Sequence, residues 1–152
     1  MPAKNLQRDI ITYWVEIATG LGFPRSVGEI YGLLFVAEEP LSADDLVEQL
    51  GISRSGAGQG IRTLVEIGAL RPAHVLGSRK EHFQLQTDLG VLVKQLLNAR
   101  ILPRLEELSR QRQTLAAAVA KNGPAHLNQR FQKLERWHGK ASPVIKLLKA
   151  FA

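Results

Sequence analysis

The chain has 152 residues and a formal net charge of +6, and it contains no cysteine. This length suits one domain, or one domain with an appended arm. The absence of cysteine excludes disulfides, thiolate nucleophiles and cysteine-ligated metals. The sequence has no apolar run of about 18 residues, so we expect no membrane span, and we do not expect its charged N-terminal segment to be a signal peptide. A cytoplasmic protein is the resulting expectation.

The charge is distributed unevenly along the chain. Residues 29–53 carry six acidic side chains and no basic one, whereas residues 89–152 carry twelve basic side chains and three acidic ones. A strongly basic segment is typical of a protein with an anionic partner. Charge alone does not identify that partner, because a lysine-rich surface also keeps a protein in solution.

Apolar residues repeat at helical spacing in the first part of the chain. The spacing predicts one helix over residues 4–21 and a second over residues 26–37, each followed by glycine or proline. Ser42 and Asp45 have the spacing of a capping box, which predicts a third, short helix. The predicted apolar face of the first helix consists of Leu6, Ile10, Tyr13, Trp14, Ile17 and Leu21.

The next segment has the pattern of a helix-turn-helix. Gly51 stands where the third helix needs a left-handed residue to end. Ser53 is a candidate N-cap for a fourth helix, in which Ala57, Ile61 and Leu64 recur at helical spacing. Two short helices joined by a glycine-containing turn are typical of this motif.

Three glycines alternate at the start of the fourth predicted helix. A dinucleotide-binding loop needs GxGxxG directly after a strand, and a P-loop needs a Lys-Ser or Lys-Thr pair, so neither interpretation fits GAGQG. We therefore interpret the stretch as helix. Gly60 falls on the packed side, whereas Gly56 and Gly58 lie nearer the solvent. Our hypothesis is that Gly56 and Gly58 let the helix backbone approach DNA closely.

Residues 71–75 and 81–85 are strand-like runs that flank a Gly-Ser turn, which predicts a β-hairpin. A hairpin directly after a helix-turn-helix is called a wing. With the turn centred on residues 78–79, His74 and His82 point to opposite faces of the sheet, which argues against a shared metal ion. No Ser-His-Asp set can be nominated either. We expect no catalytic residue, no metal and no cofactor, and hence no enzyme.

The remainder of the chain is predicted to be helical. Leucines repeat through residues 89–119, and Pro103 is expected to kink or break that helix. After a stop at residues 122–124, one further helix is expected. A last, separate helix is then predicted to begin with Ser142 as N-cap and Pro143 at its first position.

The fourth predicted helix and the wing present basic and polar side chains outward. Arginine and glutamine make bidentate contacts to guanine and adenine edges in the major groove. Serines near a helix N-terminus suit phosphate, and cations at a wing tip can reach the adjacent backbone or minor groove. The alternative is a winged-helix module that binds protein without sequence-specific DNA binding. The candidate DNA-binding residues are Ser53, Arg54, Ser55, Gly58, Gln59, Arg62, Arg79 and Lys80.

The segments PRSVGEIYGLL and GSRKEHF, together with the helix-turn-helix, resemble the MarR-type winged helix-turn-helix regulators. The resemblance is closest to the GbsR-type branch, associated with glycine betaine and choline, and covers about residues 13–120. It implies a homodimeric transcription regulator, often a repressor, on a palindromic site. It identifies residues 53–62 as the recognition helix and Arg79 as the wing arginine. Family wings often carry an acid shortly before that arginine, where this chain has Gly77 and Ser78.

The resulting prediction is a mainly α protein with a small β-hairpin wing and dimerisation helices at both ends. An N-terminal dimerisation or support helix is expected in residues 1–24, the winged helix-turn-helix in residues 25–88, and a helical dimerisation region in residues 89–152.

The resemblance further implies a choline-like or betaine-like effector for a ligand-responsive member of this branch. Such a cation is typically bound in an aromatic cage. Aromatic residues at helical spacing also serve as core or dimer contacts, and that alternative stays open. The candidate cage residues are Tyr13, Trp14, Phe23 and Tyr31.

Overall fold

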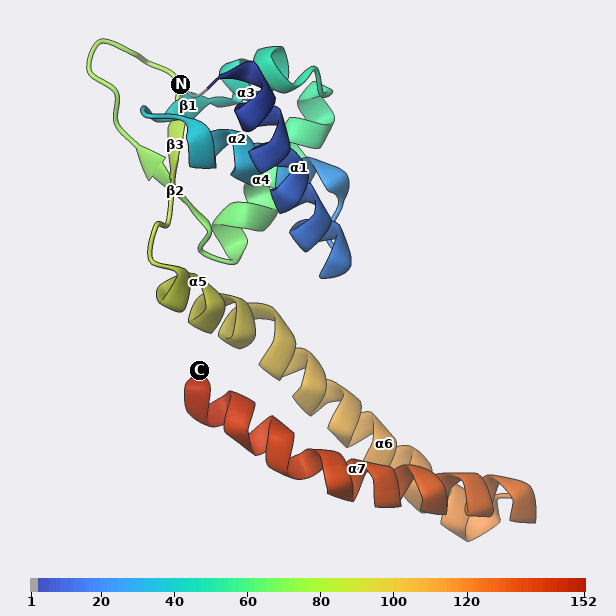
Figure 1. The fold of residues 1–152 in the computed structure, drawn as a ribbon. Helices are drawn as coiled ribbons and strands as arrows, with labels where there is room; N and C mark the ends of the chain where they lie inside the picture. The colour runs from blue at the N-terminus through green and yellow to red at the C-terminus, as the bar shows by residue number, and fades with distance from the viewer. Residues whose placement is uncertain (1–2) are drawn as a thin grey trace. The chain divides into compact units, whose positions relative to one another are not determined.

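The computed structural model describes residues 3–152, which are mainly helical and include one small sheet (Figure 1). The sheet is antiparallel, with strand order β1-β3-β2. None of the described helices is long and apolar enough to cross a membrane. The chain divides into two compact units on either side of the boundary between Leu92 and Val93. The elements are α1 (Lys4–Gly20), α2 (Arg25–Val36), β1 (Leu41–Ser42), α3 (Ala43–Leu50), α4 (Arg54–Glu66), β2 (Leu70–Ala73), β3 (His82–Leu85), α5 (Leu89–Leu96), a π-helical segment (Leu97–Ile101), α6 (Leu102–Asn122) and α7 (Ala125–Phe151).

Helices α1 and α2 approach each other through two glycines. Gly28 and Gly32 lie one turn apart on α2 and face the backbone of α1. A Cβ atom at Gly28 would lie 2.5 Å from the Cα of Val15, and one at Gly32 would lie 2.8 Å from the Cα of Ile11. Because helix separation depends on the side chains at the contact, this close packing requires glycine at both positions.

The predicted apolar face of α1 is wrong in part, because the close contact with α2 selects small side chains. Val15 and Ala18 are buried. By contrast, Leu6, Tyr13 and Leu21 are 52%, 58% and 60% exposed. The prediction placed the largest apolar residues of α1 in the core, whereas the glycines of α2 contact the neighbouring face of α1, at Ile11 and Val15. Helix α1 therefore retains an exposed apolar strip.

The core of the first unit lies between α2, α3, α4 and the sheet. Ile30, Leu33, Leu46 and Leu70 are its largest fully buried side chains. Gly60 of α4 faces α2, where an added Cβ would lie 2.5 Å from the Cδ1 of Ile30. The predicted packing role of Gly60 is thus confirmed, and this contact orients α4 with its opposite face toward the solvent.

Local hydrogen bonds set the limits of the helix-turn-helix as predicted. Asp45 Oδ2 accepts hydrogen bonds from the backbone N–H of Ser42 at 2.8 Å and from its hydroxyl at 2.6 Å. Gly51 ends α3 with a φ of 65°, in the left-handed region. The backbone N–H of Gly56 donates to Ser53 Oγ at 2.9 Å, which caps α4. The capping box, the turn and the second cap are all confirmed.

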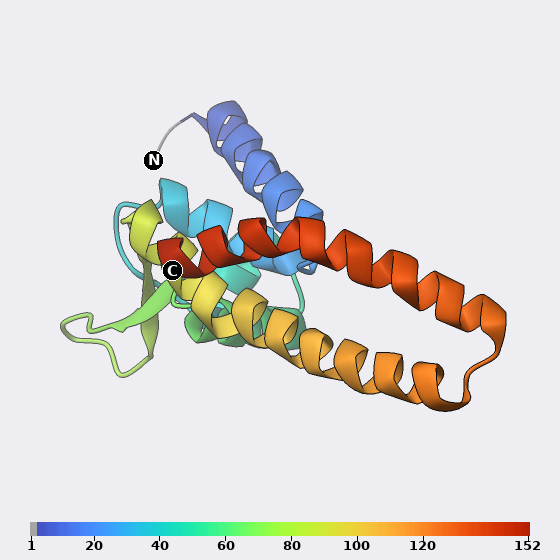
Figure 2. The same ribbon diagram turned by 90° about the horizontal axis from the view of Figure 1, so that it is seen from below.

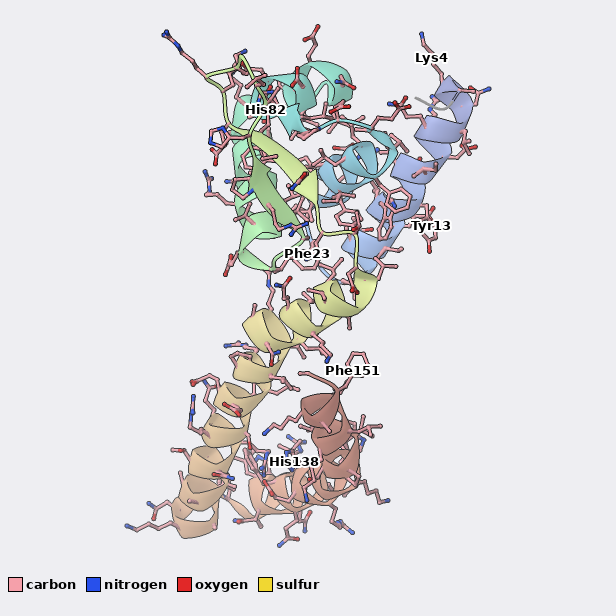
Figure 3. The ribbon with its side chains drawn as sticks, turned by 90° about the vertical axis from the view of Figure 1, so that its left-hand side faces the viewer. Lys4, Tyr13, Phe23, His82, His138 and Phe151 are labelled. Atoms are coloured by element: carbon pink, nitrogen blue, oxygen red, sulfur yellow. The ribbon has the colours of Figure 1, made fainter. Side chains whose placement is uncertain are left out.

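The wing has shorter strands and a longer loop than predicted. Ala73 pairs with His82, which centres the hairpin between Gly77 and Ser78 rather than on residues 78–79. His74 falls outside β2 and is exposed, whereas His82 lies in β3 and is buried (Figure 3). The change of register is two residues, and because strand faces alternate every residue, it does not bring the two histidines onto one face.

Strand β1 was not predicted. It has only two residues, too few to show an alternating pattern, and it pairs Leu41 with Phe83 and Ser42 with His82. This pairing joins the wing to the start of α3, because Ser42 is also the N-cap of that helix.

The second unit is a helical hairpin in which α7 returns along α6 (Figure 2). Residues on both helices form ion pairs, between Arg112 and Glu135 and, at 3.6 Å, between Lys149 and Glu106. No described residue of α6 or α7 is buried. The apolar side chains of this hairpin therefore remain at least partly exposed.

Pro103 does not stop the helix after Thr87. It lies at the start of α6, directly after the π-helical segment Leu97–Ile101. A π-helical segment is wider than an α-helix, and this relieves the clash between the proline ring and the carbonyl of Ala99. The chain therefore continues in helical conformation from Leu89 to Asn122.

The predicted separate helix from Ser142 is wrong. Helix α7 is continuous from Ala125 to Phe151, with Pro143 inside it. A proline after a serine has the same local signature at a helix start and within a helix. Gly139, whose carbonyl lies four residues before the proline, has open space at its Cβ position, so the backbone can shift there to accept the ring.

Candidate nucleic-acid interface

The outer face of α4 is polar and basic. Ala57, Gly60, Ile61 and Leu64 are its buried residues and face the core. The opposite face presents Ser53, Arg54, Ser55, Gln59 and Arg62, all exposed. Gly58 lies half-buried on this side of the helix, and an added Cβ would contact only the Nη1 of Arg62, at 3.5 Å. Packing within the structure therefore does not require glycine at position 58.

The wing tip contributes two further exposed cations, Arg79 and Lys80. The backbone N–H of Lys80 donates to Ser78 Oγ at 3.2 Å, and the ring nitrogen Nδ1 of His82 lies 2.9 Å from the carbonyl oxygen of Lys80. These contacts hold the chain on both sides of Lys80. His82 thus has a structural contact, and the described residues include no group of histidine and acidic side chains that could hold a metal ion.

Asp44 joins the wing to the N-terminus of α4, a contact that sequence reasoning missed. Its Oδ1 lies 2.7 Å from Nη1 of Arg54, and its Oδ2 lies 2.6 Å from Nζ of Lys80. Hydrogen bonds from Lys80 and then Arg54 hold the pKa of the Asp44 carboxyl below its usual range. The same contact raises the pKa of Lys80. Two of the predicted DNA-binding cations therefore share one carboxylate.

Gly77 and Ser78 precede Arg79 in the wing, and Asp44 of α3 supplies a carboxylate from another element. It pairs with Lys80 rather than with Arg79. No ion pair of Arg79 is found among residues 3–152. Arg79 is therefore the wing cation that remains available to a phosphate.

Asp44 and Lys80 border one hollow between α3, α4 and the wing, with a volume of about 400 Å³. Its apolar lining includes Ile61 and Phe83. The charged residues that line it are Asp44, Arg62, Lys80 and Glu81. The hollow therefore brings side chains of α4, the wing and the acidic α3 to one surface.

The candidate cage residues lie in and between α1 and α2, but the rings of Tyr13, Trp14 and Tyr31 form one packed cluster. The ring centroids of Trp14 and Tyr31 are 4.5 Å apart, and those of Trp14 and Phe35 are 5.3 Å apart. Tyr13 contacts the edge of Trp14, at 5.5 Å. Rings this close leave no room for a cation between them. Phe35 is a member of this cluster that sequence reasoning missed.

Tyr31 also lines a cavity of about 340 Å³ with Phe35, Glu38 and Glu39. Burial raises the pKa of the Tyr31 hydroxyl. Phe23 lies half-buried in the turn between α1 and α2. The aromatic cage therefore stays a prediction, with the Tyr31 cavity as the open space next to it.

The architecture described above defines a winged helix-turn-helix protein. A solved structure described as a transcriptional regulator has the same fold, with a TM-score of 0.65, 18% identity, and coverage of 95% of this chain and 97% of that one. No protein-family model matches the chain. The fold class predicted from the sequence is confirmed.

Relatives in Bacillus subtilis (strain 168) give the more particular assignment. The chain is 24% identical over 85 residues to the HTH-type transcriptional repressor OpcR, covering 56% of this chain and 46% of OpcR. It is 27% identical over 86 residues to the HTH-type transcriptional repressor GbsR, covering 57% and 46%. It is 24% identical over 67 residues to the putative HTH-type transcriptional regulator YvaV, covering 44% and 38%.

The chain thus spans less than half the length of the curated relatives it matches. Their names describe repressors or regulators rather than enzymes. These similarities confirm the resemblance to MarR-type regulators close to GbsR.

Proposed function

We propose that the protein is a homodimeric, sequence-specific DNA-binding regulator of transcription. The observation that carries this proposal is the outer face of α4, where exposed Arg54, Gln59 and Arg62 lie beside a cationic wing. The buried face of the same helix is fixed on α2 through Gly60. A helix held rigidly with basic and amide side chains outward suits the major groove.

The candidate side chains divide into two roles. Gln59 and Arg62 are the base readers, because each can make two hydrogen bonds to a base edge. Ser53, Arg54 and Ser55 lie at the N-terminus of α4, where side chains and free N–H groups suit phosphate. The wing cations Arg79 and Lys80 reach the neighbouring backbone or minor groove.

Exposed apolar side chains support dimerisation through both ends of the chain. Because α6 and α7 have no buried described residue, the hairpin gains little from its own packing, and helices are stabilised mainly by burying an apolar face. A second copy of the chain would cover these side chains and place two recognition helices on a palindromic site, about one turn of DNA apart. The exposed apolar side chains are Leu6, Tyr13 and Leu21 on α1, and Leu108, Leu115, Leu134, Trp137, Val144, Leu147 and Phe151 on α6 and α7.

We further propose that a small quaternary ammonium compound of the choline or betaine type changes DNA occupancy by altering the distance between the two recognition helices. Of the candidate residues Tyr13, Trp14, Phe23 and Tyr31, Tyr31 would contact it in the cavity that it lines, beside the packed rings rather than between them. The cavity beside Tyr31 supports this location, because Glu38 and Glu39 line it and attract a cation. Such a regulator acts in the cytoplasm, on the nucleoid.

Selection of bound sequences from random duplex DNA tests the proposal. We expect a palindrome with two half-sites, and a two-chain mass by light scattering. Arg62→Ala should weaken binding to the selected site by about 1–3 kcal/mol and relax the preference at one position. Arg79→Ala should weaken binding to all sequences alike.

Arg8→Ala is the matched control, because it removes the same charge from the exposed side of α1. Arg8→Ala should change the affinity for DNA by less than Arg62→Ala or Arg79→Ala does. No duplex affinity at low salt would overturn the proposal. Recovery of a stoichiometric protein partner without DNA would instead favour a winged-helix protein-interaction module.

A further inference from the structure

Asp44 is the one carboxylate that bridges the recognition helix and the wing among the described residues. Arg54 is 10 positions and Lys80 is 36 positions away in the sequence. Each of its two oxygens accepts a hydrogen bond from one of these cations. We name this arrangement the Asp44 clamp.

We propose that the Asp44 clamp lowers the affinity of the protein for DNA, because Asp44 occupies two cations that would otherwise bind phosphate. This inference rests on the proposed function. DNA binding then requires a phosphate oxygen to replace the carboxylate on Arg54 and Lys80.

The Asp44 clamp is exposed to solvent and can open. The side chains of Arg54, Lys80 and Asp44 are 80%, 63% and 41% exposed. Water and salt therefore reach all three, and exposed ion pairs of this kind contribute little to folding. The clamp can exchange one anion for another without disturbing the core.

A carboxylate and a phosphate need the same hydrogen-bond donors. Both accept short, charge-assisted hydrogen bonds from guanidinium and ammonium groups. A phosphate bound to either cation while Asp44 remained in place would lie within roughly 6 Å of the carboxylate, where two like charges repel even in water. Asp44 is therefore a competitor at this surface.

The Asp44 clamp lies beside the outer face of α4. Lys80 and Asp44 both line the hollow that also contains Gly58 and Arg62. A backbone strand of DNA that passes between α4 and the wing lies along this hollow. The carboxylate thus stands where the phosphate chain is expected, rather than on a remote face.

Replacing the carboxylate with an amide tests the inference. Affinities of the full-length wild type and Asp44→Asn are measured by fluorescence anisotropy on a duplex of about 30 base pairs, at several salt concentrations. Coulomb repulsion across about 6 Å of water corresponds to about threefold in affinity for one half-site. We expect binding about threefold tighter for one half-site and about tenfold tighter for a dimer with two.

Glu48→Gln is the matched control, because it also removes one negative charge from an exposed position on α3. No ion pair of Glu48 occurs in the part of the chain that the structure describes. We expect less than a twofold change for this variant. The gain of Asp44→Asn should shrink as salt screens the repulsion, and it should largely vanish when Arg54 and Lys80 are both replaced by glutamine, because no cation is then left for the carboxylate to occupy.

Circular dichroism at the assay temperature verifies that each variant is folded. If the wild type binds DNA and Asp44→Asn binds equally or more weakly, the inference is overturned, and Asp44 instead positions the wing. If Asp44→Asn and Glu48→Gln gain the same DNA affinity, the inference is also overturned, because the gain then comes from net charge alone. If neither protein binds any duplex, the proposed function fails, and the inference fails with it.

Discussion

Replacement of Gly28 by alanine tests the close contact between α1 and α2. The new Cβ would lie 2.5 Å from the Cα and 2.9 Å from the backbone nitrogen of Val15, and 2.7 Å from the carbonyl oxygen of Trp14. All three atoms belong to the backbone, so no side-chain rotation relieves the clash. An ordinary contact begins at 3.4 Å, and the two helices must therefore separate by about 1 Å.

Two opposing terms decide the effect of Gly28→Ala on the free energy of unfolding. Alanine favours a helix over glycine by about 1 kcal/mol. Overpacking costs about 1–3 kcal/mol and more where backbone must move, and a gap of about 1 Å forfeits up to half of the dispersion energy along the interface. We expect a net destabilisation of about 2 kcal/mol, which lowers Tm by about 4–8 °C.

Thermal unfolding followed by circular dichroism measures this effect, with Gly58→Ala as the control. At Gly58 the new Cβ meets only Arg62 Nη1, at an ordinary 3.5 Å. The control should therefore gain up to about 1 kcal/mol from helix propensity alone. A Gly28→Ala variant as stable as the wild type would refute the glycine-mediated packing.

Three other predictions concern α4, α3 and α7. Gly58→Ala should weaken DNA binding while raising Tm; unchanged affinity in an anisotropy titration would contradict the hypothesis of close backbone approach. Asp45→Asn should lower the free energy of unfolding in urea by about 1 kcal/mol at pH 7, because a neutral amide oxygen accepts the hydrogen bonds from Ser42 more weakly than the carboxylate does. Hydrogen bonds from the Ser42 hydroxyl and then from its backbone N–H lower the pKa of Asp45 in the folded protein. The stability that ionised Asp45 adds to the fold is therefore complete above about pH 4, and it is lost as the pH falls through the folded-state pKa. If Asp45→Asn remained less stable than the wild type at low pH, the ionised carboxylate would not be the source of the stabilisation. Deletion of residues 125–152 should yield a monomer by light scattering, because the exposed apolar side chains of α7 are then lost; a dimer without DNA affinity would instead make this basic segment the main DNA contact.

The sequence alone predicts the helix-turn-helix because its signals are local. The cap of α3 joins Ser42 to Asp45, and that of α4 joins Ser53 to the N–H of Gly56, each across three residues. Gly51 needs only its own backbone freedom to end α3. Hydrogen bonds over such short separations depend on residue type and spacing, so they can be predicted from a single sequence.

The sequence was less informative where one local pattern fits two structures. Ser142 and Pro143 have the signature of a helix start, yet they lie inside α7. The two residues of β1 carry no pattern of their own and become a strand only by pairing with β3. Each outcome depends on neighbouring structure rather than on the segment itself.

The sequence by itself thus determined where α4 begins, what caps it and which of its side chains face outward. Tertiary structure decided which of the exposed cations of α4 and the wing are paired with a carboxylate. Asp44 reaches Lys80 across 36 positions, and Gly28 meets Val15 on another helix. No periodicity encodes such contacts, because they arise only when separately formed elements pack and bring distant charges and backbones together.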